Sequence, residues 1–240
     1  METTKNTVLI TGGSSGIGLA LAKRFWQEKN DVIIVGRNAA KLAQVQAMLP
    51  GIKTECLDVS DVAALEQLPQ RHPQVNILIN NAGVQYNYDF SDPTQPLDLI
   101  EAEINTNVLG PLYLTKLFIP QLSKHKEAAI INVSSGLGFV PKQSAPVYCG
   151  SKAALHIFTK SLRWQLESTP IKVFEIIPAL VETSMTQGRG HGKISPEELV
   201  DEFWRSFKGN HTEVRIGKIK QLLWLNKLVP NIAEKIMRAS

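Results

Sequence analysis

The sequence predicts an α/β protein built on a doubly wound parallel sheet of about seven strands, with helices on both faces in three α/β/α layers. Short runs rich in β-branched apolar residues alternate with longer segments of helical periodicity. Most of these runs are apolar at consecutive positions, as expected for strands buried on both faces. A glycine-rich turn joins the first run to the first helical segment. Strand–helix alternation implies right-handed crossovers, so the strands should run parallel.

The elements follow one another at regular intervals along the chain. Strands are expected at residues 7–10, 32–35, 53–57, 77–79, 129–133 and 173–177, with a seventh at 214–216. Helices are expected between them at residues 17–29, 39–49, 62–71, 97–124 and 151–167.

Composition narrows the function classes. The 240 residues have a formal net charge of +4 and contain no Gly/Ser-rich or Pro-rich linker, so we expect one domain over residues 1–240. No basic face with aromatic stacking groups or recognition module is present, which argues against nucleic acid binding. Cys56 and Cys149 both lie in expected regular structure, so we expect no disulfide framework, no metal site and a reducing cytoplasmic location. No signal segment or membrane-spanning run is evident.

The glycine-rich turn reads Thr11-Gly-Gly-Ser-Ser-Gly-Ile-Gly18. Its glycines permit a tight turn, close approach of the backbone to a pyrophosphate, and close packing of helix on strand. The helix N-terminus offers free N–H groups and partial positive charge to phosphates. In this context the turn predicts a Rossmann-type dinucleotide site. The loop residues expected to bind the cofactor are Gly12, Ser14, Ser15, Gly16, Ile17 and Gly18.

Cofactor choice should be decided where the second strand ends, at Gly36-Arg37-Asn38. An acidic residue there would bond both hydroxyls of the adenosine ribose and repel a 2′-phosphate. Arg37 instead favours a phosphate-bearing ribose, so we expect Arg37 and Asn38 to select NADP(H), with NAD(H) possible. Alternatively, Arg37 covers the adenine face or points to solvent. After the third strand, Asp58 and Val59 are expected at the adenine, although Asp58 is equally suited to cap the next helix.

Tyr148 and Lys152 lie four residues apart in a segment that reads as helix, and therefore on one helical face. A phenol has an ordinary pKa of ~10, and a nearby positive charge would lower that pKa. Tyr148 can then exchange protons with a carbonyl or an alcohol. By itself the spacing is also compatible with a solvated helix face.

Five patterns agree in order and spacing with the short-chain dehydrogenase/reductase family, which the chain resembles over about residues 5–217. They are the glycine-rich turn, Asn80-Asn81-Ala82-Gly83, Asn107, Ser134-Ser135, and Tyr148 through Lys152. Within the family, the chain resembles the oxidoreductases encoded in bacterial D-alanylation operons, notably over residues 130–137 and 145–149.

The resemblance implies hydride transfer between NADP(H) and a carbonyl or secondary alcohol, with a catalytic tetrad of Asn107, Ser135, Tyr148 and Lys152. Tyr148 delivers or removes the proton, and Ser135 bonds the substrate oxygen. Lys152 lowers the phenol pKa and donates to the nicotinamide ribose. Asn107 interrupts the long helix and holds a water that connects Lys152 to solvent. Read singly, Ser135 also suits a turn cap with Ser134 as the alternative partner, and Asn107 suits a buried amide bonded to backbone.

The resemblance also implies cofactor contacts at the ends of two further strands. They involve Asn81, Ala82 and Gly83 after the fourth strand, and Pro178, Val181 and Thr183 after the sixth. Where the family often has Pro-Gly, this chain has Pro178-Ala179, which narrows backbone freedom near the nicotinamide.

A small-molecule substrate is expected beyond the carboxyl ends of the strands, at residues 85–88, 137–143 and 184–194. The glycine-rich last segment suits a lid that excludes water. Its cations Arg189, His191 and Lys193 either attract an acidic substrate or are solvated loop charges.

The helices at 97–124 and 151–167 are apolar around too much of their circumference for helices that only lie on a sheet. This favours a homodimer or homotetramer, and burial under loops is the alternative. From about residue 218 a basic amphipathic extension is expected to form two short helices divided by Pro230. Packing on the protein body or on a partner subunit is favoured over contact with an anionic membrane surface. A dinucleotide-sensing or membrane-surface scaffold is the non-enzymatic alternative.

Overall fold

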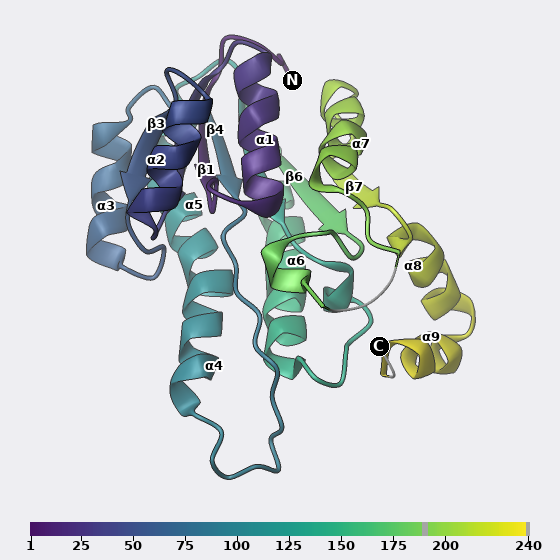
Figure 1. Cartoon of the computed structure of the whole chain (residues 1–240). Coiled ribbons are helices and arrows are strands. Elements are labelled where there is room, and N and C mark those ends of the chain that lie inside the picture. The colour runs from purple at the N-terminus through teal and green to yellow at the C-terminus, as the bar shows by residue number, and fades with distance from the viewer. Residues whose placement is uncertain (189–191, 239–240) are drawn as a thin grey trace.

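A computed structural model describes residues 1–188 and 192–238 of the chain (Figure 1). Within these residues, seven parallel strands form one sheet in the order β3-β2-β1-β4-β5-β6-β7. The strands are β1 (Thr7–Thr11), β2 (Asp31–Gly36), β3 (Lys53–Cys56), β4 (Ile77–Asn80), β5 (Ala128–Val133), β6 (Ile171–Pro178) and β7 (Glu213–Ile216). The order reverses between β1 and β4, which is the switch point of a doubly wound sheet. The expected fold class and all seven expected strands are confirmed.

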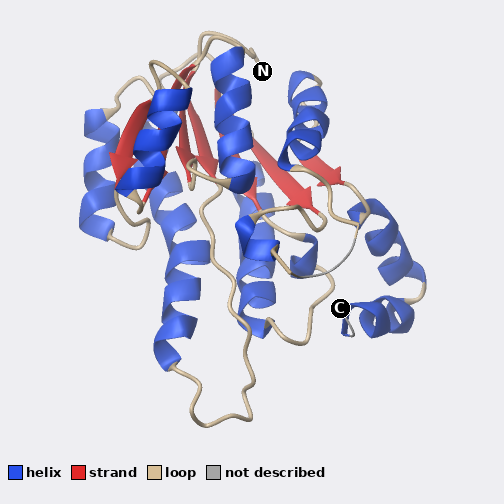
Figure 2. Cartoon of the chain, viewed as in Figure 1, coloured by secondary structure: helices blue, strands red, loops and turns tan. Residues whose placement is uncertain are grey.

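Helices cover both faces of the sheet (Figure 2). One face is covered by α1 (Gly16–Gln27), α2 (Ala39–Met48) and α7 (Pro196–Lys208), and the other by α3 (Val62–Arg71), α5 (Gly110–Leu122) and α6 (Pro146–Gln165). Strand β1 shows how the two cores separate. Val8 and Ile10 join the core under α1, whereas Leu9 joins the core under α5, because successive strand side chains point to opposite faces.

Helix α7 was missed by the sequence-based prediction, which had no element between residues 194 and 214. It begins with a capping box: Glu198 N donates to Ser195 Oγ at 3.1 Å, and Ser195 N donates to Glu198 Oε2 at 2.7 Å. Phe203, Trp204 and Phe207 are buried against the sheet. The capping-box residues followed by apolar residues at helical spacing were a readable signal.

The expected long helix at residues 97–124 is two helices joined by a π-helical turn. Helix α4 (Leu97–Ile104) passes through the turn (Asn105–Leu109) into α5. The interruption falls at Asn107 as expected, and such turns often occur at functional sites. Helix α6 begins at Pro146, five residues before the expected start at residue 151, because proline suits the first position of a helix. Tyr148 therefore lies in the first turn of α6.

In the part of the chain that the structure describes, no loop covers the outer face of α5 and α6. Ile157 is 63% exposed and Trp164 is 66% exposed, and Tyr113 is also exposed. The alternative of burial under loops is therefore wrong for these side chains. An apolar face of this kind is suited to contact with another subunit.

The basic extension forms the two expected helices, α8 (Ile219–Leu228) and α9 (Pro230–Arg238). The first residue of α8, Ile219, is buried against the body of the protein, whereas half of the ten large apolar side chains of the extension are exposed. The exposed set comprises Trp224, Leu228, Val229, Ile232 and Ile236. Among the residues that the structure describes, no helix has the length and apolar character needed to cross a membrane.

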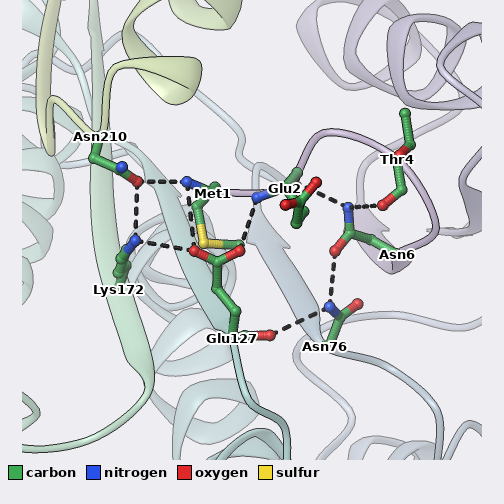
Figure 3. A network of polar contacts seen from close by, with 8 residues as sticks. All are labelled: Met1, Glu2, Thr4, Asn6, Asn76, Glu127, Lys172 and Asn210. Carbon is green, nitrogen blue, oxygen red and sulfur yellow. Dashed lines mark hydrogen bonds and ion pairs between the residues drawn. The ribbon is translucent and has the colours of Figure 1, made fainter.

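A polar network fastens the edge of the sheet at which the strands begin (Figure 3). Glu127, just before β5, accepts from Lys172 of β6 at 3.0 Å and from Glu2 N at 2.8 Å, and lies 3.5 Å from the terminal ammonium of Met1. Asn76, just before β4, donates to Asn6 Oδ1 at 2.8 Å. The network joins the starts of several strands, and the opposite end of the sheet, where the strands finish, remains for ligands.

Candidate active site

The glycine-rich turn is shaped by close contacts as well as by backbone conformation. Gly12 and Gly16 have φ values of +67° and +52°, which favour glycine. A Cβ on Gly18 would lie 2.3 Å from the carbonyl oxygen of Gly12, so no other residue fits without movement. Ser15 precedes α1 but makes no side-chain cap hydrogen bond. The first N–H groups of α1 are therefore left for a phosphate.

A cavity of about 190 Å³ opens beside this turn, at the switch point of the sheet. Its walls come from the ends of β1, β2, β3 and β4 and from the π-helical turn. The lining residues are Gly12, Ser14, Ser15, Val35, Gly36, Arg37, Asn38, Lys41, Leu57, Asp58, Val59, Ala82, Gly83, Val84 and Thr106. Nine of the cofactor residues expected from the sequence line this cavity, namely Gly12, Ser14, Ser15, Arg37, Asn38, Asp58, Val59, Ala82 and Gly83. The other lining residues, Val35, Gly36, Lys41, Leu57, Val84 and Thr106, were not among the residues expected to bind the cofactor.

The rim of the cavity at the end of β2 is rich in cations and polar groups. Arg37 and Lys41 are both exposed there. A Cβ on Gly36 would lie 3.3 Å from Ser14 Oγ, which places that hydroxyl at the same rim. The Arg37 guanidinium is 3.2 Å from Asp58 Oδ2. Arg37 is therefore held at the rim by a carboxylate.

Asp58 and Asn38 have local roles in the structure. Asn38 caps α2 by accepting from Lys41 N at 2.9 Å. Asp58 accepts from Ser60 N at 2.9 Å, whereas the residue that caps α3 is Asp61. The alternative role of Asp58 as the helix cap is therefore wrong. Burial acts to raise the pKa of Asp58, but hydrogen bonds from Ser60 and Arg37 outweigh burial and hold this pKa below its usual value.

The segment after β4 is tied to the glycine-rich turn. Thr11 Oγ1 accepts from the backbone N–H groups of Asn81 and Ala82, both at 3.0 Å, and Asn81 Nδ2 donates to Thr11 O at 2.9 Å. From the far side, a Cβ on Gly16 would lie 3.1 Å from Thr183 Cγ2. The segment after β6, with Pro178 at the strand end and Val181 buried, therefore also reaches the turn.

The four residues of the expected tetrad lie together at the carboxyl ends of β4 and β5. Ser135 follows β5, and its side chain lies close enough to Tyr148 on α6 to affect the pKa of that phenol. Lys152 Nζ lies 5.7 Å from the centre of the Tyr148 ring and donates to Val133 O at 2.9 Å. A Cβ on Gly83 would lie 3.6 Å from Lys152 Nζ and 3.2 Å from Asn107 Oδ1. Lys152 and Asn107 are therefore neighbours across Gly83.

The neighbouring serine, Ser134, does not compete for this position. It is buried, and its hydroxyl donates to Ile176 O at 3.4 Å, toward the sheet. Ser135 Oγ accepts from Leu137 N at 3.1 Å, so Ser135 is also a turn cap, as the alternative held. Its hydroxyl can serve both purposes because it has two acceptor lone pairs and one donor.

Asn107 is a fully buried amide with backbone partners. Its Oδ1 accepts from Val84 N at 2.9 Å, and its Nδ2 donates to Val84 O at 2.8 Å and to Ser151 Oγ at 3.1 Å. The alternative of a buried amide bonded to backbone therefore holds. These bonds fix the segment after β4 against the start of α6.

Burial dominates the ionisation of the Tyr–Lys pair. It raises the pKa of Tyr148 to about 12, although the nearby Ser135 hydroxyl acts in the opposite direction. Burial also lowers the pKa of Lys152 to about 8, against the attraction of Glu103 and Glu175. The expectation that Lys152 lowers the phenol pKa is wrong for the protein chain itself, because removal from water disfavours both charged forms.

Known proteins resemble this chain throughout its length. The family model described as short chain dehydrogenase matches residues 6–193. The chain belongs to the short-chain dehydrogenase family. The uncharacterised oxidoreductase DltE of Bacillus subtilis is 43% identical over 232 residues, with 92% of each chain covered. An uncharacterised oxidoreductase of Staphylococcus epidermidis is 30% identical over 205 residues, covering 82% of this chain and 88% of the relative.

Solved structures of short-chain dehydrogenases agree with this assignment. One from Burkholderia cenocepacia, in complex with NADP, has a TM-score of 0.89 at 24% identity and covers 99% of both chains. One from Sphingobium yanoikuyae, in complex with NADPH, has a TM-score of 0.82 at 28% identity and covers 98% of both chains. As a short-chain dehydrogenase, the protein is an oxidoreductase that uses a nicotinamide dinucleotide. The expected likeness to the D-alanylation oxidoreductases is also confirmed.

The segments expected to meet a substrate at residues 85–88 and 137–143 both contribute to a cavity that also touches the start of α6. The segment after β4, the loop before α6 and the end of α9 enclose a second cavity of about 540 Å³. It is lined by Tyr88, Asp89, Phe90, Ser91, Gln143, Ser144, Pro146 and Arg238. Of the expected lid cations, Arg189 and His191 lie outside the described residues. Lys193 is held by its own loop, because Nζ donates to Thr186 O at 2.6 Å.

Proposed function

We propose that the protein transfers a hydride between NADP(H) and a carbonyl or secondary alcohol, with Tyr148 as the general acid–base. The observation that supports this best is the arrangement of Ser135, Tyr148 and Lys152 at one edge of the sheet, beside a cavity whose glycine-rich wall suits a pyrophosphate. A scaffold that only sensed a dinucleotide would need the cavity but not these three side chains.

Each member of the tetrad has a task that follows from its contacts. The Tyr148 hydroxyl holds the proton that passes to or from the substrate oxygen, and Ser135 orients that oxygen beside the phenol. Lys152 Nζ keeps two donors beyond the bond to Val133 O for a ribose and for the proton path. Asn107 fixes the segment after β4 next to Lys152. The nicotinamide, when bound, supplies or accepts the hydride.

We further infer a preference for NADP(H) over NAD(H). Arg37 and Lys41 stand at the cavity rim with Ser14 nearby, and together they offer two cations and a hydroxyl to a 2′-phosphate. Asp58 neutralises part of this charge through its ion pair with Arg37. One carboxylate opposes two cations, so the rim retains a net attraction for phosphate.

Turnover of a substrate found in a screen of aldehydes, ketones and alcohols tests the reaction, with nicotinamide absorbance as the signal. Tyr148→Phe removes only the hydroxyl, so we expect turnover to vanish while NADPH affinity stays nearly the same. Tyr113→Phe removes an exposed phenol from α5 and is the matched control. Unchanged turnover in Tyr148→Phe would refute the assignment of Tyr148.

Cofactor preference is tested by titration of the purified protein with NADPH and NADH. Arg37→Ala should weaken NADPH binding roughly 10-fold or more, because a charged hydrogen bond contributes about 1.5–3 kcal/mol, and should leave NADH binding nearly unchanged. Arg71→Ala removes an exposed arginine that pairs with Glu55 outside the cavity and serves as the control. Tighter binding of NADH than NADPH by the wild type would contradict the role of Arg37.

We also infer a single domain over residues 1–240, located in the cytoplasm and assembled as a homodimer or homotetramer through the exposed face of α5 and α6. Trp164 lies on that face and is 66% exposed. Trp164→Glu should therefore shift the sedimentation of the protein toward the monomer. No change in mass would argue against this interface.

A further inference from the structure

Glu103 is a buried carboxylate outside the tetrad. It lies on α4, one helical turn before Asn107, and is fully buried. Carboxylates are rarely enclosed in this way unless a partner or a function retains them, and such groups often mark functional sites. Burial raises the pKa of Glu103 above its usual value, against the opposing effects of the nearby Tyr88, the backbone N–H of Tyr86 and the charge of Lys152.

One side of Glu103 holds the segment that follows β4. Glu103 Oε1 accepts from Tyr86 N at 3.3 Å. Glu103 Oε2 and the Tyr88 hydroxyl are both enclosed, and neither has a hydrogen-bond partner of standard geometry in the described part of the chain. Burial raises the pKa of Tyr88, and the nearby Glu103 raises this pKa further. Tyr88 N donates to Ser144 O at 3.0 Å, which links this segment to the loop before α6.

The other side of Glu103 faces α6, which packs against α4. The ionisable groups of α6 that interact with its charge are Tyr148, Cys149 and Lys152. Among the described residues, Lys152 forms no ion pair, and the acceptor of its hydrogen bond, Val133 O, is an uncharged carbonyl oxygen. A buried ammonium without a nearby negative charge is costly.

Glu175 is the other carboxylate that acts on Lys152. It is fully buried on β6, and both of its oxygens lie 3.0 Å from His156 Nδ1. Glu175 is thus already engaged by a ring nitrogen. Glu103 has no cation or imidazole among its described partners, so its charge is the one left for the ammonium of Lys152.

We propose that Glu103 is a positioning residue, whose buried carboxylate holds the segment after β4 beside the catalytic centre and supplies the negative charge that balances the Lys152 ammonium. The proposal rests on the proposed function for its effect on turnover. Its electrostatic part concerns only this chain and is testable without a substrate.

The electrostatic part is tested by titrating Lys152. Protein labelled with ¹³Cε-lysine is followed by NMR across pH, and Lys152→Met assigns the resonance. In the wild type Lys152 should titrate near pH 8. Glu103→Gln keeps the size of the side chain and removes its charge, so the Lys152 midpoint should fall by about 0.5–1 unit. Glu101→Gln removes an exposed charge from the same helix and should leave the midpoint unchanged.

The kinetic part is tested with the pH dependence of kcat/KM. In Glu103→Gln the limb governed by the Tyr148–Lys152 pair should move to lower pH, because Glu103 raises the pKa of both groups. Glu103→Asp keeps the charge and should restore the wild-type profile. Tyr88→Phe removes an enclosed hydroxyl but keeps the Glu103 charge and the bond from Tyr86 N, so the pH profile should stay in place.

The results separate this proposal from the proposed function. An unchanged Lys152 midpoint in folded Glu103→Gln overturns the proposal, even if the enzyme turns over normally. A lowered midpoint in a protein without detectable turnover supports the charge balance and counts against the proposed function instead. If Glu103→Gln does not fold, Glu103→Ser, which leaves space for water beside Tyr88, carries the same expectation and the same refutation.

Discussion

Gly18→Ala should weaken cofactor binding and lower stability together. The added Cβ would lie 2.3 Å from Gly12 O and 2.4 Å from Asn81 Nδ2. Real Cβ contacts with such atoms are rarely shorter than about 3.0 Å, so helix and turn must separate by several tenths of an ångström. Neither atom can move freely, because Gly12 O belongs to the backbone and Asn81 Nδ2 donates a hydrogen bond to Thr11 O at 2.9 Å.

Overpacking of this kind costs about 1–3 kcal/mol. For a chain of this size, the midpoint of thermal unfolding should fall by roughly 2–4 °C for each kcal/mol. Displacing the turn from the first N–H groups of α1 should also reduce NADPH affinity by about 10-fold or more, since 1.4 kcal/mol is a factor of ten. Differential scanning fluorimetry and NADPH fluorescence titration measure the two effects.

Gly150→Ala is the matched control for this prediction. Gly150 lies in α6 and its Cβ would meet no heavy atom within 4 Å. Alanine there should stabilise the protein by about 0.5–1 kcal/mol through helix propensity and leave NADPH affinity unchanged. Wild-type NADPH affinity in folded Gly18→Ala would show that contact between α1 and the turn does not shape the site.

Three further perturbations follow from individual contacts. Lys152→Met should raise the free energy of unfolding at pH 7 by about 1–3 kcal/mol while abolishing turnover. Because the folded-state pKa of Lys152 is lowered from 10.5 to about 8, the stability of the wild type rises with pH across this window. The stability gain of the variant, measured by denaturant titration, should therefore shrink toward pH 10. Glu127→Gln should lower stability at pH 7 by under about 1 kcal/mol without affecting NADPH affinity. Hydrogen bonds outweigh burial and lower the pKa of Glu127, so the stability difference between variant and wild type should disappear as pH falls through that pKa. A constant stability difference down to pH 2 would contradict the charge network. Gly136→Ala should reduce kcat, because its Cβ would lie 2.3 Å from Ile219 Cδ1 and displace the turn that carries Ser135. Adding Ile219→Ala should restore activity, and an inactive double variant would show that this contact is not the cause of the loss.

Local patterns were sufficient for the sheet and for the main lines of the site. Most strands are short apolar or β-branched runs between turn residues, so their places can be read without knowing their neighbours; β3 and β7 are mixed polar and apolar strands. The glycine-rich turn and the Tyr148–Lys152 spacing are also local, and the family resemblance then connected these separate patterns. Helix α7 was equally predictable from the capping residues Ser195 and Glu198, but these directly follow a glycine-rich segment, which is typical of a loop.

Contacts between distant segments could not be read in the same way. Arg37 and Asp58 meet because β2 and β3 are adjacent and end at the same edge of the sheet. Ile219 reaches Gly136 because α8 follows the edge strand β7. Neither pair follows a sequence period, so each depends on the order of strands, which a single sequence specifies only through the complete fold.

The ionisation of Tyr148 depends on the same kind of information. Its spacing from Lys152 predicts a lowered phenol pKa, because a positive charge one helical turn away favours the phenolate. Within the folded chain, however, Lys152 is also buried and its own pKa falls to about 8, so it loses its charge before an ordinary phenol would ionise. Among the residues that the structure describes, the Ser135 hydroxyl is the group that lowers the Tyr148 pKa. In the proposed mechanism Ser135 therefore has two effects, since the hydroxyl assigned to orient the substrate oxygen also favours the ionised form of the phenol.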